Sequence, residues 1–459
     1  MMRSMFSGVS GLRAHQTRMD VIGNNIANVN TVGFKSSRVT FQEVFSQTIR
    51  GSSAPDNATG QGGTNPMQIG LGISVGSIDN LFTPGSEERT NNPNDVSIEG
   101  DGFFIVRGNN AESYKFSRAG NITQDDYGNL MIGSMRLYGW QTRKEGSKTE
   151  FDTEQALQPL NLFTDPSNGN KRVLGATETT SAKFSGNLDC SYAGLDSANP
   201  SLALPGAGSS LADIENAVQN TPDIETFTVP YKIYDKLGND YTISVTFVKN
   251  EVDGSTTEWF WYSDDGTDPP AQGIIAFDGG GEIINDMNTH PIYPVENELL
   301  VTPSADKGTD PFTVVLDFSN LTQYNSQSSV KATQVDGYPP GEYVGHSIGA
   351  DGVITALYTN NQQQALGMIA LAYFENPAGL EKIGGNLYLP TSNSGDFQKG
   401  YKPGSASVGK LKPGTLEMSN VDLAKEFTDM ITTQRGFQAN SRIITTSDEM
   451  LQELVNLKR

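Results

Sequence analysis

Four residues carry side chains of the kinds that most often do chemistry in proteins: three histidines and a single cysteine. His15 falls in a segment expected to pack as a helix, and His290 and His346 lie far apart in loop-like sequence. A catalytic or metal site needs several such groups converging on one point. The one cysteine, Cys190, excludes an intrachain disulfide framework and a cysteine-based zinc site. We therefore expect no catalytic residue, no metal ligand and no cofactor, and predict that the chain is not an enzyme.

Two further runs resemble ligand loops only superficially. The glycine-rich run Gly70–Gly76 lacks the glycine spacing and the following helix of a dinucleotide-binding loop. The acidic run Asp125–Asn129 does not keep the ligand order of a calcium loop. An acidic hairpin turn explains the second run more simply.

The composition favours several small β-rich units. The 459 residues include 49 glycines and 22 prolines, and only 36% of them are hydrophobic. A net charge of −21 argues against a nucleic-acid partner. No apolar run approaches the roughly 20 residues of a membrane helix, and the N-terminal residues lack the pattern of a cleaved signal peptide. We expect no membrane insertion, and expect that a role outside the cytoplasm would need export without such a signal.

The C-terminal stretch, residues 419–459, is predicted to form one long helix. It contains no proline and one glycine, Gly436, in a chain otherwise rich in both. Apolar residues recur every seven positions, which is typical of a helix packed along another helix. The alternate positions of this expected seam are polar: Gln434, Ser441 and Asp448. The apolar packing residues expected here are Leu423, Phe427, Met430, Phe437, Ile444 and Leu451.

Residues 2–27 are predicted to form the partner helix. The asparagine-rich sequence that follows favours local side-chain bonds to the backbone, which ends the helix. The simpler alternative is an N-terminal helix folded onto a nearby domain. Burial of one apolar stripe at best matches the entropy lost in ordering the helices, so the pair should need neighbouring copies, as in a polymer. The packing residues expected here are Met5, Val9, Leu12, Met19, Ile22 and Ile26.

Two terminal motifs carry a resemblance to a known family. The run Asn24–Lys35, together with Ser419–Leu423 and Gln434–Ser441, resembles the paired signatures of bacterial flagellar rod and hook proteins. Weaker likeness continues inward at Asp95–Phe104 and Leu366–Ala372. The signature residues are Asn24, Asn25, Ala27, Asn28, Gly33, Phe34, Gln434, Arg435 and Gly436.

The resemblance implies a structural subunit of a helical homopolymer. The chain length and a large central insert favour the hook, a bendable tube that transmits torque from rod to filament, over the shorter rod proteins. The implied partners are rod, hook cap and hook–filament junction proteins and the flagellar export apparatus. The implied location is the flagellar hook and basal body, outside the cytoplasm.

Alternating apolar patterns predict mainly antiparallel β domains outside the helical core. Short strands around residues 103–132 and 353–374 would form one inner domain from two distant segments. The expected parts are a helical core (1–34 and 419–459), a connector with one or two short strands (35–90 and 401–418), an inner β domain (91–169 and 331–400) and an inserted outer β domain (170–330). The fold class is therefore mainly β with paired terminal helices in a coiled-coil-like core.

Only the resemblance to hook proteins suggests a chemical role for Cys190. In hook proteins of bacteria with periplasmic flagella, a cysteine in this region loses its sulfur and forms an intersubunit crosslink with a lysine. Lys171 or Lys183 would be the amine donor here. The plain alternative is a small residue at a strand end without chemistry.

Two other functions stay open at this point. One is a distal rod protein of the same family. The other is a surface β module for adhesion or ligand binding, with Trp259 and Trp261 as contacts on an aromatic strand.

Overall fold

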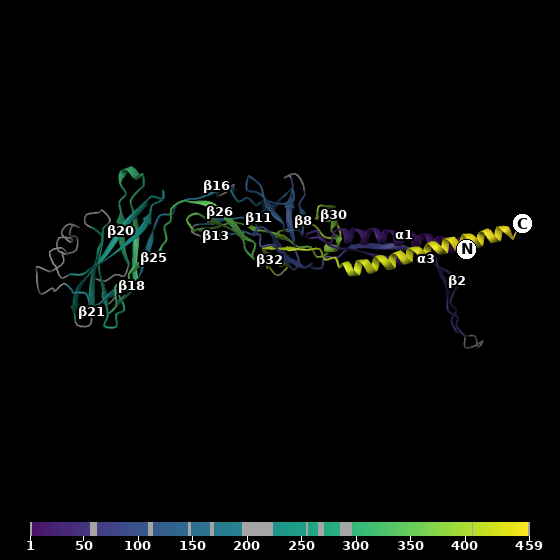
Figure 1. Cartoon of the computed structure of the whole chain (residues 1–459), viewed down its shortest axis with the longest axis horizontal. Coiled ribbons are helices and arrows are strands. Elements are labelled where there is room, and N and C mark those ends of the chain that lie inside the picture. Colours follow the sequence, from purple (N-terminus) through teal and green to yellow (C-terminus); the bar gives the residue numbers. More distant parts are fainter. Residues whose placement is uncertain are drawn as a thin grey trace. The chain divides into compact units, whose positions relative to one another are not determined.

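The chain divides into two compact units, which are described separately. Unit 1 comprises Met1–Lys171, Gly345–Ala356 and Gln363–Arg459, and unit 2 comprises Arg172–Val344 and Leu357–Gln362. The finer division into four parts stays a prediction. The structure, a computed structural model, describes residues 2–55, 62–108, 113–145, 148–165, 169–194, 224–253, 256–264, 270–284, 296–405 and 407–457. Figure 1 labels the elements along the chain.

Two long helices belong to unit 1, and both were predicted. Helix α1 spans Met2–Ala27, and its end is fixed locally because Asn28 Nδ2 donates to Asn24 O at 2.9 Å. Helix α3 spans Leu423–Asn456. The Asp422 carboxylate caps its start by accepting bonds from the backbone amides of Ala424 and Lys425, at 2.9 and 3.3 Å. Within the described residues, neither helix is long and apolar enough to cross a membrane.

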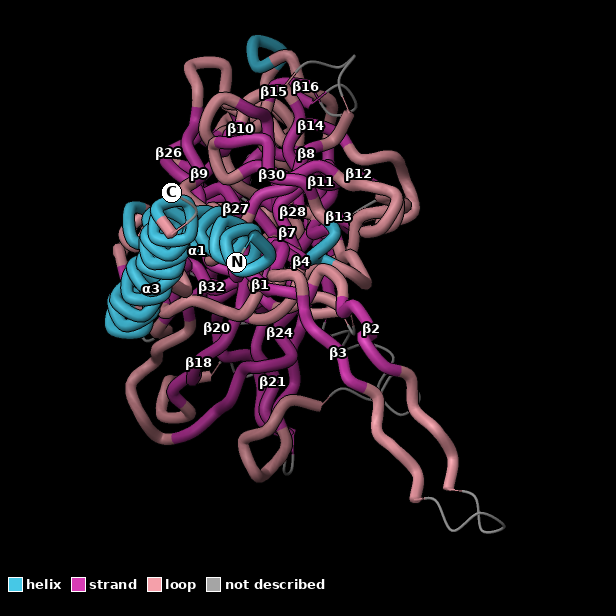
Figure 2. The backbone as a smooth tube through the Cα atoms, turned by 90° about the vertical axis from the view of Figure 1, so that its right-hand side faces the viewer, coloured by secondary structure: helices cyan, strands magenta, loops and turns pink. Residues whose placement is uncertain are grey.

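The segment after α1 forms five strands, where one or two were predicted. Strands β1 (Ser37–Glu43) and β4 (Ile73–Asn80) pair, and between them β2 (Ser46–Arg50) pairs with β3 (Met67–Gly70). Figure 2 shows the β2–β3 hairpin leading away from β1 and β4. Strand β5 (Glu87–Arg89) pairs with β33 (Thr415–Glu417), and β6 (Val96–Glu99) pairs with β32 (Lys410–Pro413). Much of the extended connector is therefore paired sheet.

The inner sheet of unit 1 is antiparallel and built from two distant parts of the sequence, as predicted. Its strand order includes β28-β11-β7-β8-β31-β30, and β29 also pairs with β7. The bounds are β7 Phe103–Arg107, β8 Lys115–Ser117, β11 Met135–Gln141, β28 Gln363–Ile369, β29 Leu371–Ala372, β30 Glu381–Gly384 and β31 Leu387–Leu389. Burial of aromatic side chains from both parts, including Phe103, Trp140 and Tyr388, holds the two segments together.

The acidic run Asp125–Asn129 is a turn, in which Asn129 Nδ2 donates to Asp125 Oδ2 at 2.7 Å.

The other strands are short or lie near the boundaries of the units. The bounds are β9 Ile122–Gln124, β10 Leu130–Ile132, β12 Arg143–Glu145, β13 Lys148–Glu150, β14 Gln158–Pro159, β15 Thr164–Asp165, β16 Gly169–Asn170, β17 Val173–Leu174, β26 Gly341–Ile348 and β27 Val353–Tyr358, with 3-10 turns at Ala305–Lys307 and Pro377–Gly379.

Unit 2 holds two four-stranded sheets around one apolar core. The first has the order β19-β20-β21-β22, and its β19–β20 hairpin was predicted. The second has the order β23-β24-β18-β25. Its β18–β24 pair is parallel, an exception that the alternating pattern did not indicate. The bounds are β18 Ser181–Asp189, β19 Thr226–Tyr234, β20 Asp240–Asp253, β21 Thr256–Asp264, β22 Gln272–Phe277, β23 Glu296–Val301, β24 Phe312–Tyr324 and β25 Lys331–Val335.

The aromatic strand of unit 2 faces the core. Trp259 and Trp261 on β21 are fully buried, and Phe260 between them and Tyr262 after them are buried as well. An adhesive surface that uses the two tryptophans as contacts is therefore wrong for this chain. Alternation alone could not decide this, because a strand covered on both sides has the same composition as one with an exposed aromatic face.

Candidate assembly site

The two terminal helices pack side by side in antiparallel directions. Figures 1 and 2 show them as neighbours. The Ser4 and Ser447 hydroxyl oxygens lie 3.4 Å apart at one end. In the middle, Arg18 Nη2 donates to Asp429 Oδ1 at 3.0 Å. At the other end, Asn25 Nδ2 donates to Glu426 Oε1 at 3.2 Å. The bonds that set the register of the pair are therefore polar.

Glycines on both helices bring the two backbones close together. A Cβ at Gly8 would lie 3.3 Å from Ile444 Cγ1, and one at Gly11 would lie 2.8 Å from Asn440 Nδ2. A Cβ at Gly436 would lie 2.8 Å from the His15 ring. The α1 side of this seam follows the alternating four- and three-residue spacing of a coiled coil, with small and polar side chains in most positions. It consists of Ser4, Gly8, Gly11, His15, Arg18, Ile22 and Asn25.

The apolar stripe predicted for α1 coincides with this seam only at Ile22, and its role in packing between copies stays a prediction. Of the six predicted residues only Ile22 is buried; Val9 is exposed, and Met5, Leu12, Met19 and Ile26 are half-buried. The buried positions of α1 are Gly8, Gly11, Ala14, Ile22 and Asn25, of which only Ile22 belongs to the predicted apolar stripe. The regular spacing of small and polar residues could have identified the seam.

The predicted stripe on α3 is split between two surroundings. Met430, Phe437, Ile444 and Leu451 are half-buried, whereas Leu423 and Phe427 are exposed. The polar seam positions were also misplaced. Gln434 and Asp448 are exposed, and the buried polar residues are Thr433 and Ser447, one position earlier on the helix. The polar character of the seam was predicted, but its residues were not.

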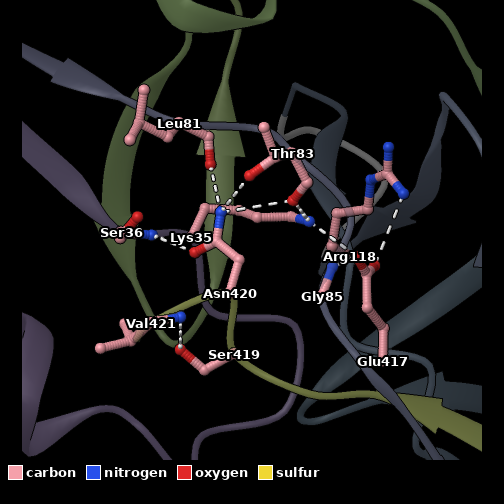
Figure 3. A network of polar contacts seen from close by, with 10 residues as sticks. All are labelled: Lys35, Ser36, Leu81, Thr83, Gly85, Arg118, Glu417, Ser419, Asn420 and Val421. Carbon is pink, nitrogen blue, oxygen red and sulfur yellow. Dashed lines mark hydrogen bonds and ion pairs between the residues drawn. The ribbon is translucent and has the colours of Figure 1, made fainter. Parts of the chain in front are cut away.

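A buried ionic cluster connects the start and the end of the chain (Figure 3). Glu417, directly before the C-terminal signature, accepts a bond from Lys35 Nζ at 2.6 Å and lies 3.5 Å from Arg118 Nη1. Lys35 Nζ also donates to Thr83 O at 2.8 Å, and the Gly85 amide donates to Glu417 Oε1 at 3.0 Å. All three charged side chains are almost completely buried. One carboxylate thus holds two cations from distant strands and loops.

The cluster is electrostatically dependent on Glu417. Burial lowers the pKa of Lys35, and the charge and hydrogen bond of Glu417 act in the opposite direction. The Arg118 guanidinium also lies 5.2 Å from the centre of the Phe103 ring, a cation–π contact. Without the carboxylate, two buried positive charges would lack their anionic partner.

Several signature residues surround this cluster. Gly33 has a φ of +68°, its amide donates to Glu417 O at 2.7 Å, and a Cβ there would lie 2.7 Å from the Ala119 nitrogen. The Lys382 ammonium lies 4.7 Å from the centre of the Phe34 ring and donates to Lys35 O at 2.7 Å. Burial lowers the pKa of Lys382 to about 8. The Val32–Lys35 end of the N-terminal motif is thus a docking loop within the subunit.

A second polar contact ties the C-terminal signature to the same loop. Asn420 Oδ1 accepts a bond from the Ser36 amide at 2.8 Å, and Asn420 Nδ2 donates to Leu81 O at 2.8 Å. Three other signature residues, Ala27, Gln434 and Arg435, are exposed to solvent. The signatures therefore combine residues that join the chain ends with residues left at the surface.

An exposed apolar flank remains on the helix pair. On α3, Phe427 is 51% exposed and Ile431 is 58% exposed, and on α1, Phe6 is 68% exposed. Large apolar side chains exposed in such number are candidates for a protein contact. The exposed large apolar residues of the two helices are Met2, Phe6, Val9, Leu423, Phe427, Ile431, Ile443, Met450, Leu454, Val455 and Leu457.

Of the residues considered for chemistry, one belongs to the helix pair. His15 is in the seam, its ring 5.6 Å from that of Phe41, and burial lowers its pKa. His346 lies on β26, and His290 falls outside the described residues. Cys190 follows β18 and is half-buried, and Lys249 Nζ donates to its carbonyl at 2.6 Å. Sequence spacing had not pointed to Lys249.

The two predicted amine donors differ in accessibility. Lys171 is buried in unit 1, where its Nζ donates to Leu366 O at 2.8 Å. Lys183 lies on β18 in unit 2, with 44% of its side chain exposed and an ion pair to Asp317 at 3.4 Å. Cys190 and Lys183 belong to the same extended stretch, seven positions apart, which at roughly 3.3 Å per residue keeps them from meeting within one chain.

Both ends and the centre match models of flagellar proteins. Residues 5–35 match the model described as flagella basal body rod protein, and residues 412–457 match flagellar basal body rod FlgEFG protein C-terminal. Residues 206–338 match flagellar basal body protein FlaE D2 domain. The class defined by the paired helices and their signatures is thus that of the flagellar rod and hook proteins.

Relatives that match the whole chain show which family within this class it belongs to. The chain is 39% identical over all of its length to flagellar hook protein FlgE of Borreliella burgdorferi, and 36% identical to that of Treponema pallidum, with both relatives fully covered. A flagellar basal-body rod protein FlgG of Bacillus subtilis is 29% identical, also with full coverage of both chains. The chain belongs to the flagellar hook protein FlgE family.

The first prediction concerns the ionic cluster. Replacing Glu417 by Gln should lower the free energy of unfolding by about 3–5 kcal/mol, because it removes the carboxylate that directly contacts buried Lys35 and Arg118. Urea unfolding measures this change. The matched control is Asp240→Asn, which breaks an exposed pair with Lys232 and should change little. Equal effects of the two substitutions would show that the cluster is not a major source of stability.

The second prediction concerns the close approach of the helices. Gly436→Ala should loosen the pair, since its Cβ would overlap the His15 ring, and should speed amide hydrogen exchange in α1 and α3. Gly23→Ala is the control, because no atom lies within 4 Å of its Cβ position and alanine favours helix. The double variant Gly436→Ala/His15→Ala should regain slow exchange. Unchanged exchange in Gly436→Ala alone would contradict the seam.

Proposed function

We propose that this chain, a structural subunit of the flagellar hook, assembles through α1 and α3 into a tube that bends while it transmits torque from rod to filament. The observation that carries the proposal is the division of the helix pair into two surfaces. The seam within the subunit is small and polar, and the large apolar residues are left at the outside. Such residues gain most from burial by another copy.

The exposed flank supports a polymer rather than a soluble monomer. Full burial of a large apolar side chain stabilises a contact by roughly 1.5–3 kcal/mol. Leu423, Phe427 and Ile431 are spaced four residues apart along α3, so they form one face that a neighbouring helix could cover. The β domains would then lie outside the helical core, and small shifts between copies would permit bending.

The remaining parts of the proposal come from the family. Rod, hook cap and hook–filament junction proteins would be the partners of the tube, and the flagellar export apparatus would deliver the subunit outside the cytoplasm without a cleaved signal. A distal rod protein remains the second candidate, because a rod relative matches the whole chain. A straight and rigid polymer would favour that candidate.

The third prediction tests assembly through the helices. Electron microscopy of the concentrated full chain should show tubes, and a variant without residues 2–27 and 423–456 should show none. This truncation keeps Lys35, Glu417 and Asn420, so it should leave the ionic cluster intact. Unfolding measurements on the truncated variant check this. Tubes from a folded truncated variant would overturn the role of the helices.

A finer proposal concerns a covalent link between copies. A base would remove the Cα proton of Cys190 while the sulfur leaves as hydrosulfide, which gives dehydroalanine. The neutral amine of a neighbouring copy's lysine would then add to Cβ, forming a C–N bond. Lys183 is a better donor than Lys171, because its side chain is partly exposed and Lys171 is buried. Lys249 is a further candidate, since it already lies at the Cys190 backbone.

The fourth prediction tests this link. Tubes boiled in detergent should give a ladder of multimers on a denaturing gel, and tubes of Cys190→Ala should give monomer alone. Lys183→Arg should remove the ladder and Lys171→Arg should keep it, because arginine retains the charge but is a poor nucleophile at neutral pH. Complete dissolution of the unmodified tubes to monomer would exclude the link and leave assembly unaffected.

A further inference from the structure

The C-terminal turns of α3 form a surface of their own, the α3 tip, defined as Met450–Leu457. Met450, Leu454 and Leu457 are 50%, 49% and 80% exposed and lie four and three residues apart, so they share one face. Every residue from Gln452 to Leu457 is exposed. Glu453 lies on the same side as the three apolar residues, at the position between Met450 and Leu457. The tip therefore has an uncovered apolar face with one acidic residue, Glu453, beside it.

A groove of complementary character runs between α1 and β4 in unit 1. It has a volume of about 390 Å³, and Figure 2 shows β4 near α1. Phe6 and Val9 on α1 and Ile73 and Val75 on β4 supply its apolar walls. Arg13 is the one charged residue among those that line it. No acidic side chain is part of this lining, so the groove suits an apolar surface that carries negative charge.

We propose that this groove binds the α3 tip of a second copy of the chain, with Glu453 facing Arg13. The inference rests on the proposed polymer and names one of its contacts. The tip and the groove match in shape and in charge. The tip offers an apolar helical face with one acidic residue, and the groove has apolar walls with one basic residue. Desolvation of Phe6, Val9, Met450 and Leu454 would provide the attraction, and the ion pair would set the register.

The tip of the same copy cannot occupy the groove. Helix α3 runs antiparallel to α1, and its contact at Ser447 is already opposite Ser4. Beyond that point α3 continues away from Arg13, which lies nine residues further along α1, roughly 14 Å at 1.5 Å per residue. The groove of one copy and the tip of another are different surfaces. A contact of this kind leaves a free groove at one end of the assembly and a free tip at the other, and so propagates into a polymer.

The fifth prediction is a charge exchange across the proposed contact. Arg13→Glu and Glu453→Arg should each raise the critical concentration for tube formation by about tenfold, because each places like charges together. The double variant Arg13→Glu/Glu453→Arg should assemble at nearly the original concentration. Arg3→Glu, an exposed charge reversal on α1 outside the groove lining, should have less than about a twofold effect.

The outcomes separate this inference from the polymer itself. The three substituted residues, Arg3, Arg13 and Glu453, are exposed, so urea unfolding of each variant should match that of the unmodified chain. Absence of tubes from the unmodified chain would overturn the proposed function. Tubes from the unmodified chain with equal assembly of both single variants would overturn only the groove contact. Loss of assembly that the double variant does not restore, or an equal loss in Arg3→Glu, would overturn it too.

A second pair of substitutions tests the apolar part. Met450→Ser/Leu454→Ser should raise the critical concentration at least as much as Glu453→Arg, because it removes the face that would enter the groove. If this variant assembles normally but fails to bind another flagellar axial protein, the tip serves a different partner and the proposed contact between copies is wrong.

Discussion

The single carboxylate of Glu417 is the constraint on which the arrangement of unit 1 depends. It lies between Lys35, which follows α1, and Arg118, which follows β8, and all three side chains are buried. Charges taken out of water are tolerated only where geometry and hydrogen bonds compensate them. This requirement fixes the exit of α1 and the approach to α3 relative to the inner sheet. The two helices can therefore meet in one register although some four hundred residues separate them.

The polar seam is consistent with this constraint. Gly8, Gly11 and Gly436 remove the side chains that would separate the helices, and Arg18–Asp429 and Asn25–Glu426 fix their direction. Burial of small residues supplies little hydrophobic stabilisation. The pair is therefore held by the ionic cluster at one end and by few apolar contacts along its length, which agrees with the proposal that neighbouring copies cover it. Small and polar residues in the seam make the contact between α1 and α3 weak. The same distribution leaves large apolar side chains exposed, where another copy could bury them.

Local patterns predicted what local physics determines. The bounds of α1 followed from periodicity and the asparagine-rich end, and the β19–β20 hairpin from alternation around a turn. The sharing of one sheet by two distant segments was predicted with the help of the family resemblance. The Lys35–Glu417–Arg118 cluster was missed, because single charged residues far apart in sequence give no periodic signal. The parallel β18–β24 pair was missed for a similar reason, since alternation does not specify strand direction.

Two apolar residues that were predicted to pack, Leu423 and Phe427, lie instead on the surface of α3. Leu423 and Phe427 keep the spacing of a packed helix, yet within the subunit they are exposed, while the buried positions of the same helix are Thr433 and Ser447. A seven-residue apolar repeat shows that a helix packs against something; it does not show that the partner belongs to the same chain. Here the small and polar residues serve the contact within the subunit. The exposed apolar residues, such as Leu423 and Phe427, are the ones that we propose other copies cover, whereas Ile444 lies against Gly8 within the subunit. The apolar repeat of α3 therefore describes two surroundings at once.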